Sequence, residues 1–200
     1  MSARLIFIKL FLFSCFFYGQ GEDLFKNLRL DSEKNLDLLP QNMIFTQRLL
    51  WGNKGLFRII GISPLNEEQR ESELKLRRKM LKLHQVIGFL TLAGMVTQGV
   101  LGTQLYNGKG YLYRKHKKIG NLTSLSYFTG ASLSLFSPPP LISRKDKGFS
   151  SVKAHKYLAS IHFSSMLATN ILSKRNRNLH RVAALSAFGS YAAAILVFKF

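Results

Sequence analysis

Four uncharged, strongly apolar stretches fill most of the chain after residue 82, and Lys and Arg gather between them. They cover residues 83–108, 119–143, 157–173 and 182–198. An α-helix needs about 20 apolar residues to cross a bilayer, with a range of about 17–25, so all four are long enough. Helices of a soluble bundle would carry charged outward faces, which these stretches lack. The pattern predicts an all-α integral membrane four-helix bundle. We expect its helices at about 83–106, 117–137, 154–173 and 180–198.

The first 21 residues have the pattern of a secretory signal peptide. Arg4 and Lys9 form a positively charged N-terminal part, and residues 10–18 form a short apolar core. Gly19-Gln20-Gly21 has the small residues that are typical of a cleavage site. The core is too short to span a bilayer. An uncleaved anchor or an interfacial segment is the alternative, and the residues around Cys15 leave a lipoprotein interpretation open.

Residues 22–79 form a polar region before the membrane domain of residues 80–200. Ser63 and Pro64 predict an N-cap and a first helical residue ahead of a helix over 65–82, with acids early and bases late. We expect this helix to continue into the first apolar stretch. Two i,i+4 ion pairs are predicted along it, Glu71 with Lys75 and Glu73 with Arg77.

Positive charge is concentrated in the apolar part of the chain. The sequence has 29 Lys and Arg against 10 Asp and Glu, a net charge of +19, and nine of the ten acids precede residue 74. A basic soluble protein would suggest nucleic acid as a partner. Because the basic part of this chain is also its most apolar part, we expect membrane lipid and no nucleic acid. Cys15 is the only cysteine, so no disulfide can form within the chain.

Four of the five histidines mark the starts of the apolar stretches, one at each. They are His84, His116, His155 and His180. Each is followed four residues later by a small residue, namely Gly88, Gly120, Ala159 and Ala184. Each is followed eleven residues later by Met or Tyr, namely Met95, Tyr127, Met166 and Tyr191. The alternation of Met and Tyr indicates a duplicated two-helix unit.

This spacing has a chemical interpretation. A residue four positions after a histidine lies on the same helix face, one turn deeper, and Gly or Ala there would let a flat macrocycle approach the backbone. Because consecutive helices run in opposite directions, His84 should face His155 near one side of the membrane, and His116 should face His180 near the other. Two histidines on facing helices can ligate one haem iron. The pattern predicts two b-type haems per chain, with the four histidines as iron ligands.

His162 complicates the third helix. It lies seven residues after His155, on nearly the same face and two turns deeper. It could replace His155 as a ligand, hydrogen-bond within the bundle, or lie between the two cofactors. The positions of Ala159 and Met166 favour His155.

Metal sites without haem fit the composition less well. Non-haem iron, manganese and magnesium sites use carboxylates, and the four apolar stretches contain none. Zinc or copper held by histidine alone stays open, but it does not explain the small residues.

The chain resembles the cytochrome b561 family over about residues 80–200. The resemblance rests on helix order, on the placement of the four histidines, and on the fragments His84–Gly88 and Lys153–Tyr157. In that family, the first and third helices bind one haem and the second and fourth bind the other. The resemblance implies that the four histidines are axial ligands and that electrons cross a membrane from donors such as ascorbate, with ferric iron as an acceptor for some members. Two features depart from the family: His162 is extra, and the flanking helices of six-helix members are missing.

We therefore expect a di-haem membrane cytochrome that relays single electrons between an unidentified donor and acceptor on opposite faces. Whether it is a carrier or an ascorbate- or ferric-reductase-like oxidoreductase stays open. The alternative is a haem-free scaffold or assembly protein whose basic loops bind anionic lipid or a partner.

The signal-like segment sets the expected location. It predicts the bacterial inner (cytoplasmic) membrane, with residues 22–79 on the exported side. Lys and Arg are almost evenly divided between the two rims, ten against nine, so they do not decide the orientation. A homodimer is a further open expectation.

Overall fold

The computed structural model describes residues 38–142 and 150–197, which belong to one compact unit. The elements are α3 (Phe45–Trp51), α4 (Leu56–Ile59), α5 (Glu67–Tyr106), the 3-10 helix η2 (Gly110–Leu112), α6 (Tyr113–Leu135), α7 (Ser151–Leu172) and α8 (Arg177–Leu196). The described residues contain helices and no strand, which confirms the all-α prediction. The signal-like segment at residues 1–21 lies outside the described residues.

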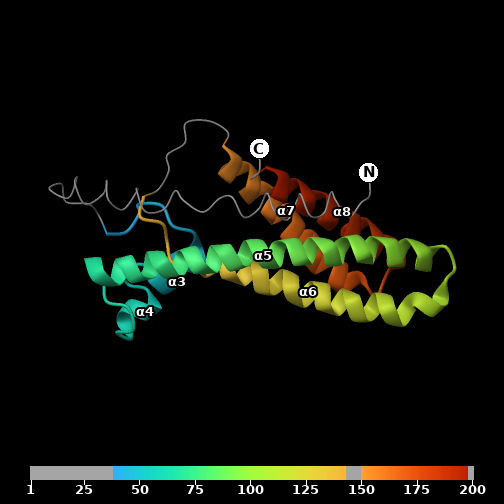
Figure 1. The fold of residues 1–200 in the computed structure, drawn as a ribbon, viewed down its shortest axis with the longest axis horizontal. Helices are drawn as coiled ribbons and strands as arrows, with labels where there is room; N and C mark the ends of the chain where they lie inside the picture. Colours follow the sequence, from blue (N-terminus) through green and yellow to red (C-terminus); the bar gives the residue numbers. More distant parts are fainter. Residues whose placement is uncertain (1–37, 143–149, 198–200) are drawn as a thin grey trace, which may run out of the picture. The chain divides into compact units, whose positions relative to one another are not determined.

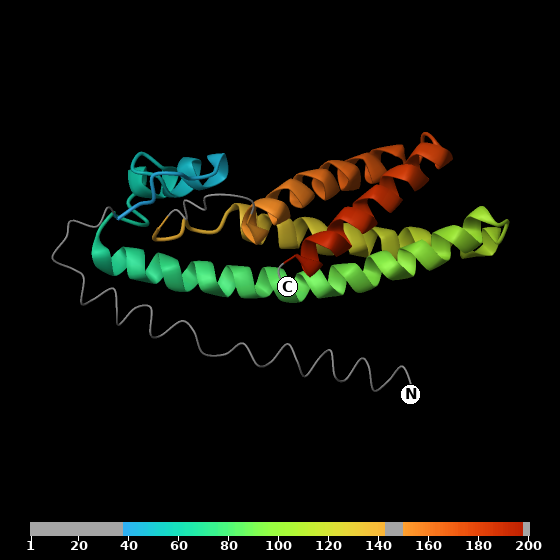
Figure 2. The same ribbon diagram turned by 90° about the horizontal axis from the view of Figure 1, so that it is seen from above.

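The four long helices form two antiparallel pairs, seen in Figure 1 and from above in Figure 2. Helix α5 packs along α6, which we call the first hairpin, and α7 packs along α8, the second hairpin. The backbones of α5 and α8 also approach one another between the hairpins. Each hairpin therefore carries one copy of the repeated histidine pattern.

Helix α5 runs without a break from the polar region into the first apolar stretch, as the sequence predicted. Its start differs from the prediction. Asn66 is the N-cap, and its side-chain oxygen accepts a hydrogen bond from the backbone N–H of Gln69 at 2.8 Å. Ser63 cannot serve as the cap because its buried hydroxyl bonds the carboxylate of Glu73. The predicted N-cap at Ser63 and first helical residue at Pro64 were therefore wrong.

The other long helices begin slightly earlier than predicted. Helix α6 follows directly from η2 and ends at Leu135, ahead of three prolines that cannot donate helical hydrogen bonds. Helices α7 and α8 each start after a side-chain cap: Ser150 accepts from the N–H of Lys153, and Asn176 accepts from that of Leu179. These caps satisfy backbone donors at the helix starts, and neither cap was among the sequence predictions.

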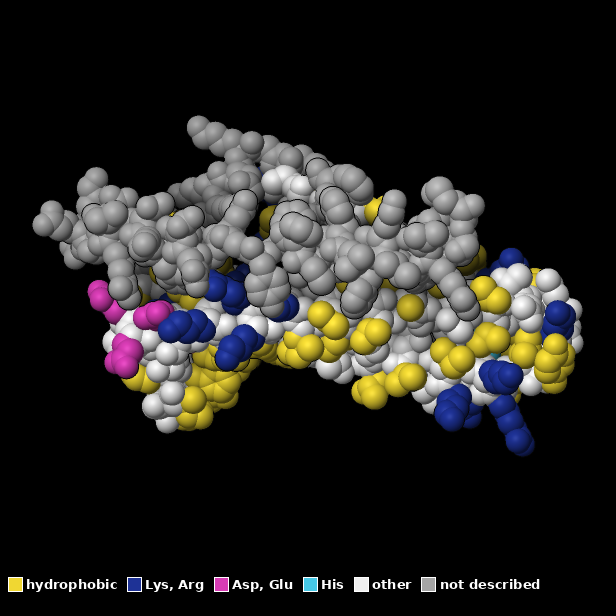
Figure 3. Space-filling view, viewed as in Figure 1, with side chains coloured by type: hydrophobic (Ala, Val, Ile, Leu, Met, Phe, Trp, Pro, Cys, Tyr) yellow, Lys and Arg dark blue, Asp and Glu magenta, His cyan; other side chains and the backbone are white. Residues whose placement is uncertain are grey.

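Two helices, α5 and α8, are long and apolar enough to cross a membrane. Within the described ranges, no other helix meets both conditions. Helix α6 has four Lys or Arg residues and one histidine among its first six residues, and it carries seven Ser, Thr or Asn residues further on. On the face drawn in Figure 3, hydrophobic side chains occupy the stretch between two groups of Lys and Arg, and the acidic side chains gather at the N-terminal end of α5.

A buried charge cluster, which we call the rim clamp, fixes the segment before α5. The clamp consists of Arg58, Ser63, Arg70 and Glu73. The Glu73 carboxylate accepts hydrogen bonds from both guanidiniums and from the serine hydroxyl, and Arg70 and Glu73 are each only 2% exposed. Arg70 also donates to the backbone carbonyls of Leu38 at 2.8 Å and Pro139 at 3.2 Å. The clamp therefore ties the polar segment to the turn after α6.

Arg77 corrects one of the two predicted ion pairs. Its guanidinium donates to the Ser137 hydroxyl at 3.0 Å and to the Pro138 carbonyl at 2.7 Å, instead of pairing with Glu73. The predicted Glu73–Arg77 pair was wrong because the carboxylate is already held by the other two arginines. The exposed Glu71–Lys75 pair is confirmed at 2.9 Å.

Helix α3 closes the C-terminal end of α6. The Thr46 hydroxyl donates to the Leu135 carbonyl at 2.5 Å, and the Trp51 indole N–H donates to the Phe136 carbonyl at 3.0 Å. These carbonyls have no partner within the last turn of a helix, so side chains from α3 satisfy them.

Candidate functional site

Four histidines occupy two levels of the paired hairpins. All four are half-buried, with His84 on α5, His116 on α6, His155 on α7 and His180 on α8. The rings of His116 and His180 lie with their centres 6.2 Å apart and their planes at 85°. His84 and His155 lie within electrostatic range of each other. The structure thus brings His116 and His180, one from each hairpin, close together, and it places His84 and His155 at the other level.

Three of these histidines use Nδ1 in the same way. Nδ1 lies 2.8 Å from the Gly130 carbonyl in His84, 3.1 Å from that of Ala194 in His155, and 2.8 Å from that of Thr169 in His180. A carbonyl only accepts hydrogen bonds, so each Nδ1 must be the protonated donor. The neutral ring then keeps a free lone pair on Nε2, which is the state that ligates a metal.

The carbonyl acceptors follow one register. In each case the acceptor lies fourteen residues after the histidine of the other helix in the same hairpin, as Gly130 does after His116. Ala194 follows His180, and Thr169 follows His155, by the same spacing. At 1.5 Å per residue, fourteen residues separate the two histidine levels by about 21 Å along a helix. The two levels are therefore related by the antiparallel pairing within each hairpin.

His116 breaks the register. The position fourteen residues after His84 is Gln98, but the carbonyl of Gln98 does not receive the His116 ring. The side-chain Nε2 of Gln98 instead donates to the backbone carbonyl of His116 at 3.0 Å. Among the described residues, the buried Nδ1 of His116 has no hydrogen-bond partner. The ring lies against Gly102, where an added Cβ would come within 3.2 Å of Cε1.

Two of the four small residues that follow the histidines lie beside polar side chains of neighbouring helices. Beside Gly88, the space that a Cβ would enter borders the Tyr191 hydroxyl at 3.5 Å, and that hydroxyl donates to the Gly88 carbonyl at 3.1 Å. Beside Gly120, the same space borders Gln98 Oε1 at 3.4 Å. Ala159 and Ala184 are half-buried. The approach of a macrocycle to these four positions stays a prediction.

The residues eleven positions after the histidines meet in the core. Met95, Tyr127 and Met166 form a buried cluster, and Tyr191 packs against it. Tyr127 is only 3% exposed, and its ring centre lies 5.7 Å from that of Tyr191. All four members of the repeat therefore face the interior, between the two histidine levels.

His162 lies inside this aromatic cluster. Its Nδ1 is 2.6 Å from the Tyr127 hydroxyl, and its ring centre lies 5.0 Å from that of Tyr191. Of the three roles that the sequence left open, hydrogen bonding within the bundle is the one these contacts describe. If Tyr127 donates, the neutral imidazole carries its proton on Nε2 and has no lone pair left for a metal.

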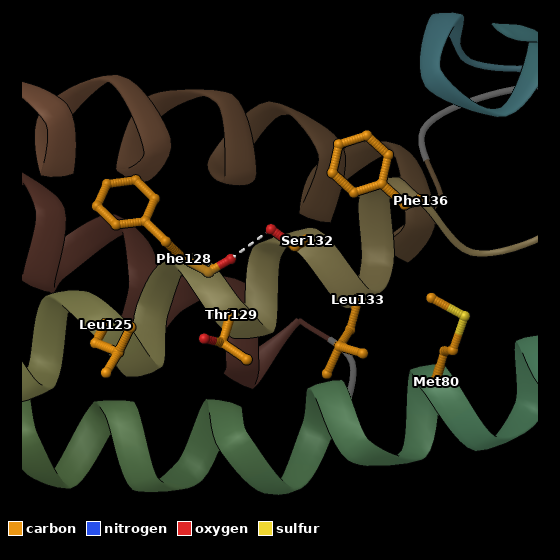
Figure 4. A pocket seen from close by; sticks show the side chains of 7 residues that line it. All are labelled: Met80, Leu125, Phe128, Thr129, Ser132, Leu133 and Phe136. Atoms are coloured by element: carbon orange, nitrogen blue, oxygen red, sulfur yellow. Dashed lines mark hydrogen bonds between the residues drawn. The ribbon is translucent and has the colours of Figure 1, made fainter. Parts of the chain in front are cut away.

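In the part of the chain that the structure describes, no three His, Cys, Asp or Glu side chains come together. Figure 4 shows a pocket lined by residues of α6 and its neighbourhood and by Met80 of α5, and the lining contains no histidine or charged side chain. It is lined by Met80, Leu125, Phe128, Thr129, Ser132, Leu133 and Phe136. The histidine pairs are therefore the candidate site.

No protein-family model, curated protein or solved structure matches this chain. The resemblance to the cytochrome b561 family accordingly rests on the residues named above.

Sequence reasoning missed the carbonyl acceptors of the histidines. A backbone carbonyl has no residue signature, so only the register of the hairpins identifies it. The one signal within the sequence was the constant spacing of the repeat, since similar helix offsets in both hairpins imply similar backbone neighbours.

Proposed function

We propose that the chain is a four-helix membrane cytochrome that holds two b-type haems and relays single electrons between the two faces of a bilayer. His84 and His155 would hold one haem iron, and His116 and His180 the other. Each haem would carry one electron at a time. The four histidines would bind the two iron ions through their ring nitrogens, and the surrounding helices would orient the rings and keep the site apolar.

The observation that carries the proposal is the separation of His116 and His180. Two imidazoles on opposite sides of one metal ion have ring centres about 6 Å apart, because each metal–nitrogen bond is roughly 2 Å and each ring adds about 1 Å. The measured separation is 6.2 Å. The distance between the two rings is therefore compatible with both histidines binding one iron ion.

The Nδ1 bonds of the histidines give independent support. Metal-bound histidines usually donate their other ring N–H to a carbonyl or carboxylate, which fixes the tautomer and orients the ring. His84, His155 and His180 all make such a bond to a backbone carbonyl of the paired helix. His162 bonds a tyrosine hydroxyl instead, which favours His155 as the ligand on α7.

Helices α6 and α7 have features that suit the same membrane location as α5 and α8. Helices α6 and α7 pack along these two apolar helices and expose large hydrophobic side chains of their own, such as Leu125 at 66% and Ile171 at 59%. Helices whose outward side chains are aliphatic and uncharged suit a lipid surround. We therefore propose that all four long helices span the bilayer.

Cationic side chains at the His116–His180 end suit haem propionates. Arg177 and Arg181 lie over the ring of Tyr106, at 4.6 Å and 4.4 Å from its centre. Arg177 precedes His180 by less than one helical turn, and Arg181 directly follows it. Guanidiniums in this position can bind carboxylates through charge-assisted hydrogen bonds.

Absorption spectroscopy tests the proposal directly. The full chain, expressed with haem supplied and purified in detergent, should show a Soret band and a reducible α-band with two haems per chain. His→Ala at position 84, 116, 155 or 180 should each remove about half of the haem. His162→Ala is the matched control and should retain both haems.

Two results would overturn the proposal. Purified wild-type protein without a Soret band would leave the haem-free scaffold as the explanation of the basic loops. Full haem content in the His84→Ala protein would exclude the proposed pairing of helices.

A further inference from the structure

The two histidine pairs are not equivalent in their hydrogen bonding. In the pair of His84 and His155, both Nδ1 atoms are bonded to carbonyls. In the other pair, His180 is bonded to the Thr169 carbonyl, and the buried Nδ1 of His116 has no partner in the described residues. One of the four predicted axial ligands therefore lacks the contact that its three counterparts share.

Gly102 lies directly beside the His116 ring. It lies one helical turn after Gln98, whose carbonyl would complete the register, and the His116 ring rests on its bare backbone. An added Cβ at Gly102 would be 3.2 Å from Cε1 and 3.7 Å from Nδ1 of His116. The equivalent positions next to His84 and His180 are Ser134 and Ser173, which carry side chains. Within the described residues, only His116 has a glycine at this place.

Gln98 reinforces the displacement. Its side-chain amide donates to the His116 backbone carbonyl at 3.0 Å and lies next to Gly120. The amide therefore holds the α6 backbone at this level without touching the ring nitrogen. The imidazole is left between Gly102 on one side and His180 on the other.

A hydrogen bond from Nδ1–H to a carbonyl raises the basicity of the imidazole and strengthens its donation to a metal. A more basic axial ligand stabilises ferric iron relative to ferrous iron and lowers the reduction potential. The haem held by the pair that lacks one such bond should therefore have the higher reduction potential. When the chain carries a single electron, that haem should be the reduced one.

We propose that Gly102, by holding His116 away from the carbonyl of Gln98, makes the His116–His180 pair the electron-accepting end of the bundle. Gly102 acts through His116 and is a positioning residue. This inference rests on the proposed function, and it adds a direction to the electron relay: from the His84–His155 level toward the His116–His180 level.

Potentiometric titration of single-haem variants of the full, haem-loaded chain tests the order of the two sites. His84→Ala should retain the haem at His116 and His180, with the higher midpoint potential. His116→Ala should retain the haem at His84 and His155, with the lower midpoint potential. The reverse order, or equal potentials, would overturn the inference while leaving the di-haem function intact.

A second variant tests the role of Gly102 itself. Gly102→Ala should push the His116 ring toward the carbonyl of Gln98, so the higher of the two wild-type midpoint potentials should shift downward while the lower one stays. The electron paramagnetic resonance signal of the same haem should shift with it. Gly99→Ala is the matched control, because no atom lies within 4 Å of the Cβ it adds on the same helix. It should change neither potential nor signal.

The outcomes separate the two proposals. Wild-type protein without haem would overturn the proposed function and this inference together. Two haems whose potentials are the same in Gly102→Ala and in wild type would overturn only the role of Gly102.

Discussion

The rim clamp and the paired hairpins are stabilised in opposite ways. The clamp encloses ionic side chains that are at most 6% exposed, and each of them has several hydrogen-bond partners. The hairpins have a small core of Met and Tyr, and large aliphatic side chains cover their outer surface. The clamp thus depends on charge pairing, whereas the hairpins depend on close contact between helices. Variants in each region should therefore fail for different reasons.

The largest expected effect is loss of the clamp carboxylate. Glu73→Ala leaves two buried guanidiniums without their shared partner, and breaking a buried ion pair in this way costs about 3–5 kcal/mol. The thermal unfolding midpoint in detergent should fall, and protease cleavage within residues 38–66 should accelerate. Glu71→Ala removes only an exposed pair with Lys75 and should cost less than about 1 kcal/mol. Equal effects of the two variants would refute the description of the clamp.

Acid should weaken the clamp to a smaller extent. Burial acts to raise the pKa of Glu73, but hydrogen bonds from Arg58, Ser63 and Arg70 hold that pKa below its ordinary value of 4.5. The unfolded chain therefore binds this proton more readily than the folded chain. The stabilisation is complete above about pH 4.5 and is lost as the pH falls through the lowered pKa.

Proteolysis of residues 38–66 measured against pH checks this direction. Cleavage should accelerate on acidification in wild type, and Glu73→Gln should remove most of that dependence. Protection that increases toward acid pH would contradict the prediction.

The next largest effect concerns helix contact in the first hairpin. At Gly94, an added Cβ would lie 2.5 Å from Oγ1 and 3.3 Å from Cβ of Thr123, a residue that is only 5% exposed on α6. Gly94→Ala should force the helices apart and cost about 1–3 kcal/mol, measured as a lower unfolding midpoint in detergent. Gly99→Ala on the same helix meets no atom within 4 Å and should be neutral or slightly stabilising. An equally mild result at Gly94 would mean that α5 and α6 are less closely packed than described.

The smallest effect tests the polar contact within the core. Tyr127→Phe removes the hydrogen bond to His162 but keeps the ring in its cluster, so the expected loss is about 1 kcal/mol. Tyr111→Phe changes an exposed side chain and serves as the control for the unfolding midpoint. A Tyr127→Phe protein as stable as the control would show that this bond contributes nothing to the core.

Much of the helical framework could be predicted from the sequence. The apolar stretches predicted the long helices to within a few residues, and the acidic and basic ends of the region before residue 83 correctly predicted a helix continuous with the first stretch. The repeat also singled out the residues eleven positions after each histidine, and in the structure these four side chains pack together in the core. These features follow from local periodicity, which is readable along one chain.

The remainder depended on contacts distant in sequence. The pair of Glu73 with Arg77 was predicted from spacing alone, whereas Arg58 reaches the same carboxylate from fifteen residues away and Arg70 approaches on its other side. The displacement of His116 onto Gly102 depends on how α6 is packed against α5. Neither the partners of Glu73 nor the position of the His116 ring can be recognised from the periodicity of a single helix.

The unbroken course of α5 has a mechanical consequence. Its 40 residues form one continuous rod that begins at the clamp, passes His84, and reaches Gly102 beside His116. A helix of this length extends about 60 Å. A rotation of this rod at its clamped end would turn His84 and Gly102 together relative to α6. The polar segment is therefore covalently continuous with one helix position at each of the two histidine levels.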